Sequence, residues 1–146
     1  MYSYDCIGVR ISPNGVFGGM GSADNDKMFT YGAAQLSTFG LAYMHVMDGL
    51  TFGFHNLCAP VTLHDIKKNF DGPVMGNIDY TKELAEGALR SGAADLIAFG
   101  RSYMTNPDLV ERFANNWPLA PYPPYEQWYG GGEVGYTDYP TYQASA

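Results

Sequence analysis

Short apolar runs alternate with longer amphipathic segments along this chain, and the alternation limits the folds it can adopt. Each apolar run has the length of a strand, and each following segment carries apolar residues at helical spacing. We expect strands at residues 6–11, 41–46, 73–75 and 95–99, and helices at 27–39 and from Thr62, Thr81 and Asn106 onward. Consecutive βα units form a parallel sheet with crossover helices. The sequence therefore predicts an α/β fold.

Two architectures accommodate four consecutive βα units: a small doubly wound sheet, or part of a TIM (β/α)8 barrel. A complete barrel usually takes about 250 residues, whereas this chain has 146. It could therefore supply only half of a barrel. The periodicity ends after Trp117, and we expect an irregular tail rich in Pro, Tyr and Gly over residues 118–146.

The expected helix starts carry capping residues. Thr62 and Asp65 have the spacing of a capping box, in which each side chain binds the backbone N–H of the other residue. Thr81 opens the following helix. Asn106, with Pro107 directly behind it, predicts a last helix that has Asn106 as its N-cap.

The composition argues against several classes of partner. Lys and Arg number 8 against 15 Asp and Glu, so the formal net charge is −7. No run of basic residues marks a surface for nucleic acid or anionic lipid. No apolar stretch approaches the roughly 18 residues of a membrane span, and the N-terminus lacks a signal-peptide pattern. We expect a cytoplasmic protein with no nucleic-acid or membrane partner. Its two cysteines and three histidines have no metal-ligand spacing, so no metal site is expected.

Two glycine-containing strand ends could bind a phosphate group. Gly76-Asn77 and Gly100-Arg101 each lie at the end of an expected strand. In barrels, the loops after the last two strands often hold a phosphate with backbone N–H groups and a helix N-terminus. Glycine permits close approach of the backbone, and the arginine fork can bind two phosphate oxygens. The alternative is that these are ordinary glycines that end strands.

Arg10 is a charged residue in an otherwise apolar expected strand. A charge at the C-terminal end of a barrel strand would point into the ligand mouth, and the other interpretation is a structural ion pair. We interpret His45 as a core residue, and Asp48 and Asp95 as a loop acid and a turn acid. Residues 128–140 are either a flexible aromatic-rich terminus or a loop that lays an aromatic ring against a planar ligand.

Five spaced motifs occur in order over nearly the whole chain. They are Val9-Arg10-Ile11-Ser12-Pro13, Ala42-Tyr43-Met44-His45-Val46, Gly76-Asn77-x-x-Tyr80-Thr81, Ala98-Phe99-Gly100-Arg101-x-Tyr103-x-x-Asn106-Pro107-Asp108-Leu109 and Gly135-Tyr136-Thr137-Asp138-Tyr139-Pro140. Together they resemble the old yellow enzyme family of flavin-dependent ene-reductases. The resemblance covers the C-terminal half of that family's barrel, strands five to eight.

The resemblance implies an FMN-bound barrel that moves hydride from NADPH or NADH to the flavin and then to the β-carbon of an activated alkene. Arg10 matches the arginine beside the flavin's pyrimidine edge, where a fixed cation stabilises the negative charge of the reduced flavin. Tyr129 matches an aromatic near the dimethylbenzene edge. The residues that match those holding the FMN phosphate are Gly76, Asn77, Gly100 and Arg101.

The same resemblance assigns no catalytic residue to this chain. The family's His/Asn or His/His pair that binds the substrate carbonyl, and the tyrosine that protonates the α-carbon, lie in the N-terminal half. We therefore expect residues 1–146 to form a single partial domain of an FMN-dependent NAD(P)H oxidoreductase. It would be a fragment of a longer chain, a split gene product that pairs with an N-terminal half-barrel, or a half-barrel that self-associates. The alternatives are a non-catalytic FMN- or phosphate-binding half-barrel or partner subunit, and a βα enzyme that acts on a sugar phosphate without flavin.

Overall fold

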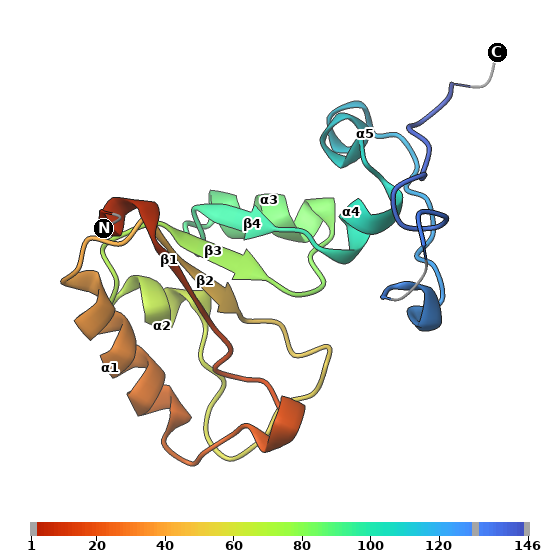
Figure 1. The fold of residues 1–146 in the computed structure, drawn as a ribbon. Helices are drawn as coiled ribbons and strands as arrows, with labels where there is room; N and C mark the ends of the chain where they lie inside the picture. The colour runs from red at the N-terminus through yellow and green to blue at the C-terminus, as the bar shows by residue number, and fades with distance from the viewer. Residues whose placement is uncertain (1–2, 130–131, 145–146) are drawn as a thin grey trace. The chain divides into compact units, whose positions relative to one another are not determined.

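The computed structural model describes residues 3–129 and 132–144, and the chain divides into two compact units, residues 1–98 and 99–146. Figure 1 shows both units as ribbons. The first unit contains η1 (Tyr4–Cys6), β1 (Gly8–Ile11), η2 (Phe17–Gly19), α1 (Asn25–Ser37), β2 (Tyr43–Met47), α2 (Leu63–Lys67), β3 (Val74–Asn77), α3 (Lys82–Arg90) and β4 (Leu96–Ala98). The second contains α4 (Arg101–Thr105), α5 (Leu109–Asn115) and η3 (Tyr125–Gln127).

The four strands of the first unit form one parallel sheet in the order β1-β2-β3-β4. This confirms the predicted α/β fold with parallel strands. A doubly wound sheet reverses its strand order at a switch point, and no reversal occurs among the four described strands. Each strand lies beside its neighbour in the sequence instead, which is the order of strands in a βα barrel.

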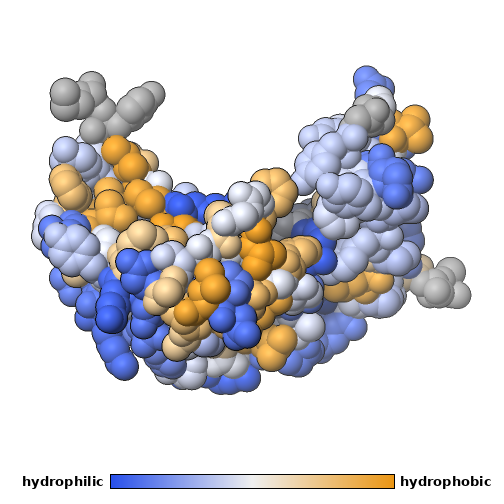
Figure 2. All heavy atoms as spheres, turned by 90° about the horizontal axis from the view of Figure 1, so that it is seen from below, coloured by the Kyte–Doolittle hydropathy of each residue, from blue (hydrophilic) through white to orange (hydrophobic). Residues whose placement is uncertain are grey.

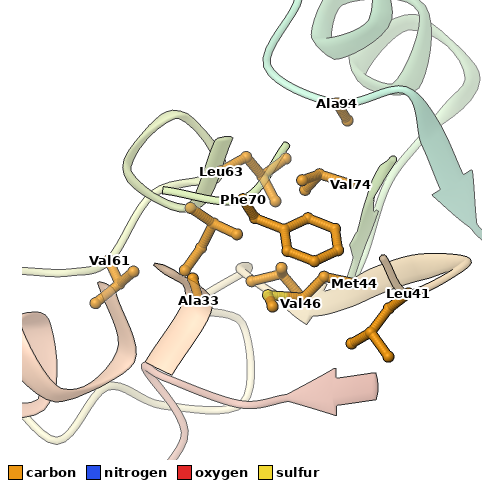
Figure 3. Close-up of a cluster of buried hydrophobic side chains, with 10 residues drawn as sticks. Ala33, Leu41, Met44, Val46, Val61, Leu63, Phe70, Val74 and Ala94 are labelled. Atoms are coloured by element: carbon orange, nitrogen blue, oxygen red, sulfur yellow. The ribbon is translucent and has the colours of Figure 1, made fainter. Parts of the chain in front are cut away.

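One face of the sheet carries the hydrophobic core of the first unit. Met44, Val46 and Val74 point to this face and are fully buried. Figure 3 shows the ring of Phe70 among Leu63, Val74 and the β2 side chains. The helices α1 and α2 and the segments beside them complete this core, which consists of Ala33, Leu41, Met44, Val46, Val61, Leu63, Ile66, Phe70, Val74 and Ala94.

The opposite face of the sheet has no comparable core among the described residues of the first unit. Side chains alternate along each strand, so the registered rows Arg10-His45-Met75-Leu96 and Met47-Asn77-Ala98 share this face. None of these residues is fully buried. All-parallel sheets are normally covered on both faces. We call this surface the open face; its members are Gly8, Arg10, Tyr43, His45, Met47, Met75, Asn77, Leu96 and Ala98.

The capping residues predicted for two helices are confirmed. Thr62 Oγ1 accepts a hydrogen bond from Asp65 N at 3.2 Å, and Asp65 Oδ2 accepts one from Thr62 N at 3.0 Å. Thr81 Oγ1 accepts from Leu84 N at the start of α3. The helix α2 is short, so Phe70 reaches the core from the turn after it. No helix in the described part of the chain combines the length and apolar character needed to cross a membrane.

The predicted N-cap at Asn106 is wrong, and α4 was not predicted. Asn106 ends α4, and Asp108 is the residue before α5. The Asn106 side chain is fully buried, donates to Ser102 O at 2.8 Å and accepts from Ala120 N at 2.8 Å. Its amide therefore holds the segment that follows α5 and does not cap the first turn of that helix.

The tail is tied to α5 by a buried ion pair. Arg112 Nε donates to Asp108 Oδ1 at 2.7 Å, and the two side chains are only 7% and 10% exposed. Asp108 Oδ2 also accepts from Tyr142 N at 2.7 Å, and Arg112 Nη1 donates to Pro118 O at 2.7 Å. Although burial opposes it, these donors hold the pKa of Asp108 below its ordinary value. These contacts anchor the tail at Pro118 and at Tyr142.

We predict that Phe70→Ala destabilises the first unit by about 3–5 kcal/mol, because it leaves a cavity at the centre of the core. Phe17 is a matched control, since its ring is 87% exposed; Phe17→Ala should change the free energy of unfolding by no more than about 0.5 kcal/mol. Urea unfolding followed by circular dichroism measures both. Equal losses for the two variants would contradict the assigned core.

Asp95 should make the folded chain sensitive to acid. The side chain of Lys67 and the backbone N–H of Val74 hold the pKa of Asp95 below its ordinary value of 3.8. As the pH falls, Asp95 is therefore protonated in the unfolded chain before it is protonated in the folded chain. The contribution of Asp95 to the free energy of unfolding is present above pH 3.8 and is lost as the pH falls toward the lower pKa of the folded state. Asp95→Asn should flatten the acid side of the stability curve measured by thermal unfolding. An unchanged acid dependence in Asp95→Asn would refute this assignment.

Candidate functional site

Arg10 lies on the open face near the carboxyl end of β1, and it is exposed. Its strand is therefore not buried on both faces, as its apolar sequence had suggested. Arg10 Nη2 donates a hydrogen bond of 3.3 Å to Asn77 Oδ1 on β3. Since β2 lies between these two strands, the arginine reaches across it. The structure thus brings together two of the residues predicted to bind FMN.

Asn77 connects three strands at the carboxyl edge of the sheet. Besides accepting from Arg10, its side chain donates from Nδ2 to Ala98 O at the end of β4, at 2.8 Å. Its backbone N–H donates to Asp48 Oδ1 at 3.1 Å. The predicted phosphate site requires backbone N–H groups that donate to the anion. The N–H of Asn77 already donates to Asp48, so it would not donate to a phosphate. A ligand would meet the Asn77 side chain or the turn that follows.

Gly76 faces the core side of the sheet and has a packing reason to lack a side chain. A Cβ at this position would lie 3.0 Å from Tyr80 Oη, 3.0 Å from Leu63 Cδ1 and 3.1 Å from Ile97 Cδ1. Gly100 differs, because no atom lies within 4 Å of its ideal Cβ position. Packing therefore accounts for Gly76, and it leaves Gly100 unexplained.

Asp48 and Tyr80 form a hydrogen-bonded pair that the sequence reasoning missed. Tyr80 Oη donates to Asp48 Oδ2 at 2.7 Å. Burial raises the pKa of Asp48, against the effect of the hydrogen bonds that it accepts. Burial and the neighbouring Asp48 carboxylate raise the pKa of Tyr80 as well, so its hydroxyl stays protonated. The signal available in the sequence was an acid directly after one parallel strand and a tyrosine shortly after the next.

The turn between β3 and α3 has an unusual backbone. Ile78 and Asp79 have φ values of +97° and +57°, a region that residues with side chains seldom adopt, above all β-branched ones. The β2–α2 loop supports this turn. Thr51 Oγ1 donates to Asp79 Oδ2 at 3.2 Å, and Gly49 lies so close that a Cβ there would be 2.8 Å from Ile78 Cβ. Strain of this kind persists where the surroundings hold it, often at functional sites.

His45 lies in register between Arg10 and Met75 on the open face. Its Nε2 atom is buried and has no hydrogen-bond partner in the described part of the protein. Burial, and then the Arg10 charge, lower the pKa of His45, while the Asn77 side chain opposes the shift. A neutral imidazole with an unsatisfied ring nitrogen is suited to a ligand or a further segment of protein. Within residues 3–129 and 132–144, no three His, Cys, Asp or Glu side chains gather as metal ligands would.

The remaining predicted site residues belong to the second unit. Gly100 is the residue before α4, and Arg101 is the first residue of that five-residue helix. The Arg101 guanidinium carbon lies 5.8 Å from the centroid of the Tyr122 ring. Tyr129 follows η3 and is 78% exposed. Each unit therefore contains part of the predicted cofactor site: Arg10, Gly76 and Asn77 in the first, and Gly100, Arg101 and Tyr129 in the second.

The loops that leave the carboxyl ends of β1 and β2 expose large apolar side chains. A Cβ added to Gly53 would lie 3.0 Å from Val16 Cγ2, so the two loops touch. Phe17 is 87% exposed and Phe52 is 57% exposed. Apolar side chains reach the surface among polar ones in Figure 2. Such an apolar rim suits a ligand or partner with apolar surface; its members are Val16, Phe17, Met20, Leu50, Phe52 and Leu57.

Comparison with known proteins gives consistent similarities. A 12-oxophytodienoate reductase-like protein from Solanum lycopersicum is 36% identical over 93% of this chain and 36% of its own length. A probable flavin mononucleotide-dependent alkene reductase from Leishmania infantum is 33% identical over 92% of this chain and 35% of its own length. The structure of the old yellow enzyme homologue from Zymomonas mobilis matches with a TM-score of 0.84 and 38% identity, over 92% of this chain and 38% of that protein.

The chain therefore spans little more than a third of the length of the relatives it matches. Residues 2–120 match the family model described as NADH:flavin oxidoreductase / NADH oxidase family. That match covers most of the chain, and the relatives and the solved structure agree with it. This chain belongs to the NADH:flavin oxidoreductase / NADH oxidase family.

Proposed function

We propose that this chain is part of an FMN-dependent NAD(P)H oxidoreductase that reduces activated alkenes. FMN, when bound, would supply the chemistry that transfers hydride from NADPH or NADH to the β-carbon of the alkene. The observation that carries the proposal is the Arg10 guanidinium, held by Asn77 at the carboxyl edge of the open face. Ligands of βα barrels bind at the carboxyl ends of the strands. The Leishmania infantum relative, named as a flavin mononucleotide-dependent alkene reductase, supports the same activity.

The four βα units are proposed to be strands five to eight of a TIM barrel. Support comes from the consecutive strand order and from the open face, which would be the inner wall of the closed barrel. The proposed partner is an N-terminal half of the same architecture, which would supply the substrate-binding pair and the proton donor. Residues 1–146 would then be one partial domain, with residues 118–146 as its irregular tail. A cytoplasmic location stays a prediction.

The residues of this chain fit an FMN molecule in their chemistry. Arg10 offers a cation, and His45 Nε2 is a buried polar atom without a partner in the described residues. Arg101 offers a guanidinium and Tyr129 an exposed ring. We assign Arg10 to the pyrimidine edge, Tyr129 to the dimethylbenzene edge, and the phosphate to Gly100 and Arg101 together with the Asn77 side chain or the turn after it. Gly76 stays a prediction for the phosphate site, beside its packing role.

The chain's own contribution to the reaction would be electrostatic. Asn77 orients the Arg10 guanidinium, so its positive charge is in place before negative charge develops on the ligand. His45, whose pKa is lowered by burial and by Arg10, stays neutral beside it. The apolar rim would contact the apolar part of a small alkene. No described residue is assigned as the proton donor, because Tyr80, the strongest candidate by its hydrogen bond, is committed to Asp48.

The colour of the purified chain tests this function. We expect a flavin absorption band after supplying FMN, loss of the band with NADPH, and at most weak reoxidation by cyclohexenone, because the substrate-binding half is missing. Addition of the N-terminal half should restore turnover. A band that NADPH does not bleach, even with that half present, would indicate a flavin-binding module. Absence of any band in both preparations would contradict the proposal and leave a phosphate-binding βα protein without flavin.

Two substitutions in the second unit test the phosphate assignment. Arg101→Ala should weaken FMN retention about tenfold or more, since a charged hydrogen bond contributes about 1.5–3 kcal/mol. Gly100→Ala should also weaken it without lowering the melting temperature, because no atom of the chain lies within 4 Å of the added Cβ. Arg90→Ala, at an exposed arginine of α3, is the matched control. Flavin fluorescence during titration measures retention, and unchanged retention in Arg101→Ala would refute the assigned role.

A further inference from the structure

Asn77 connects Asp48 to Arg10, the proposed flavin cation. Asp48 follows β2, and its Oδ1 accepts from Asn77 N on β3 at 3.1 Å. Asn77 Oδ1 in turn accepts from Arg10 Nη2 on β1 at 3.3 Å. The carboxylate thus fixes the backbone of the residue whose side chain orients the guanidinium. Only one residue separates Asp48 from Arg10 in this chain of contacts.

The second carboxylate oxygen of Asp48 holds the other end of the same turn. Oδ2 accepts from Tyr80 Oη at 2.7 Å, and Gly76 leaves the space that this hydroxyl occupies. Asn77 and Tyr80 are the residues on either side of Ile78 and Asp79, whose φ values are positive. One carboxylate therefore spans the strained turn from end to end. Without it, Asn77 and Tyr80 would each lose a hydrogen bond that holds one end of the strained turn.

We propose that Asp48 is a positioning residue of the flavin site: it holds the turn after β3 and, through Asn77, the Arg10 guanidinium. The inference rests on the proposed function, because it assigns Arg10 to a bound flavin. Asp48 would act on the ligand only through Asn77 and the turn. Its carboxylate is half-buried and accepts hydrogen bonds from the neutral donors Asn77 N and Tyr80 Oη, so its place at this edge of the sheet costs free energy that these two bonds offset.

Asp95 is a matched control within the same sheet. It accepts from Val74 N at the amino end of β3, at 2.8 Å, much as Asp48 accepts from Asn77 N at the carboxyl end. Asp95 is bound to Lys67 and its side chain is 42% exposed. An effect of Asp48→Asn that Asp95→Asn does not reproduce would therefore belong to the carboxyl edge and not to general loosening of the strand.

The test compares the wild-type full chain with three single variants, Asp48→Asn, Asp95→Asn and Tyr80→Phe. The last of these removes only the hydroxyl group. Amide hydrogen exchange of residues 77–84, measured without flavin, should be about tenfold faster in Asp48→Asn than in wild type, as expected for loss of one hydrogen bond to a charged group. With FMN supplied, the dissociation constant of FMN should rise about tenfold in Asp48→Asn. The midpoint potential of the flavin should fall, because a displaced Arg10 stabilises the negatively charged reduced flavin less. Tyr80→Phe should give a smaller change in the same direction.

Unchanged exchange in Asp48→Asn would overturn the proposal, as would faster exchange with an unchanged dissociation constant and midpoint potential. Equal changes in Asp95→Asn would also overturn it. A wild-type chain that binds no FMN would contradict the proposed function instead. The exchange measurement needs no flavin, so it still decides whether Asp48 holds the turn.

Discussion

In the described residues of the first unit, the parallel sheet has a hydrophobic core on one side only, and the rest of this structure depends on that constraint. Val46 and Val74 are completely buried on the core side, whereas Arg10, His45 and Asn77 lie on the open face. The outer strands β1 and β4 each pair with one described neighbour, and unpaired strand edges favour association. An open face and two free edges are both removed when a barrel closes. The same closure would surround the polar residues that the open face presents.

Asn77 is the residue that organises those polar groups. Its side chain links Arg10 on β1 to Ala98 at the end of β4, and its backbone binds Asp48 after β2. All four strands thus contribute to one set of hydrogen bonds at the carboxyl edge. The neighbouring Gly76 serves the same set by leaving space for the Tyr80 hydroxyl. Contacts within the protein are therefore sufficient to account for Gly76 and Asn77 at these two positions.

Local signals in the sequence predicted the strands, the capping residues Thr62 and Thr81, and the place of Arg10 at a carboxyl strand end. These features depend on residues that are close together in the chain. The contact between Asp48 and Tyr80 joins two loops across the sheet, and it follows from strand register, which periodicity does not specify. The N-cap prediction at Asn106 is wrong for a related reason. The Asn106 side chain accepts from the backbone of Ala120 in the tail and does not bind the first turn of α5.

If the open face is the surface that contacts the flavin, the signals of the three histidines should reveal it in one experiment. His45 lies on the open face, His64 is exposed on α2, and His55 bonds to Pro13 O in the loops. Nitrogen–proton correlation spectra of the imidazole rings, recorded with and without FMN, report on all three. We expect the His45 signals to shift on addition of FMN and the His64 signals to stay unchanged. Unchanged His45 signals in a sample that binds FMN would contradict contact between the open face and the flavin.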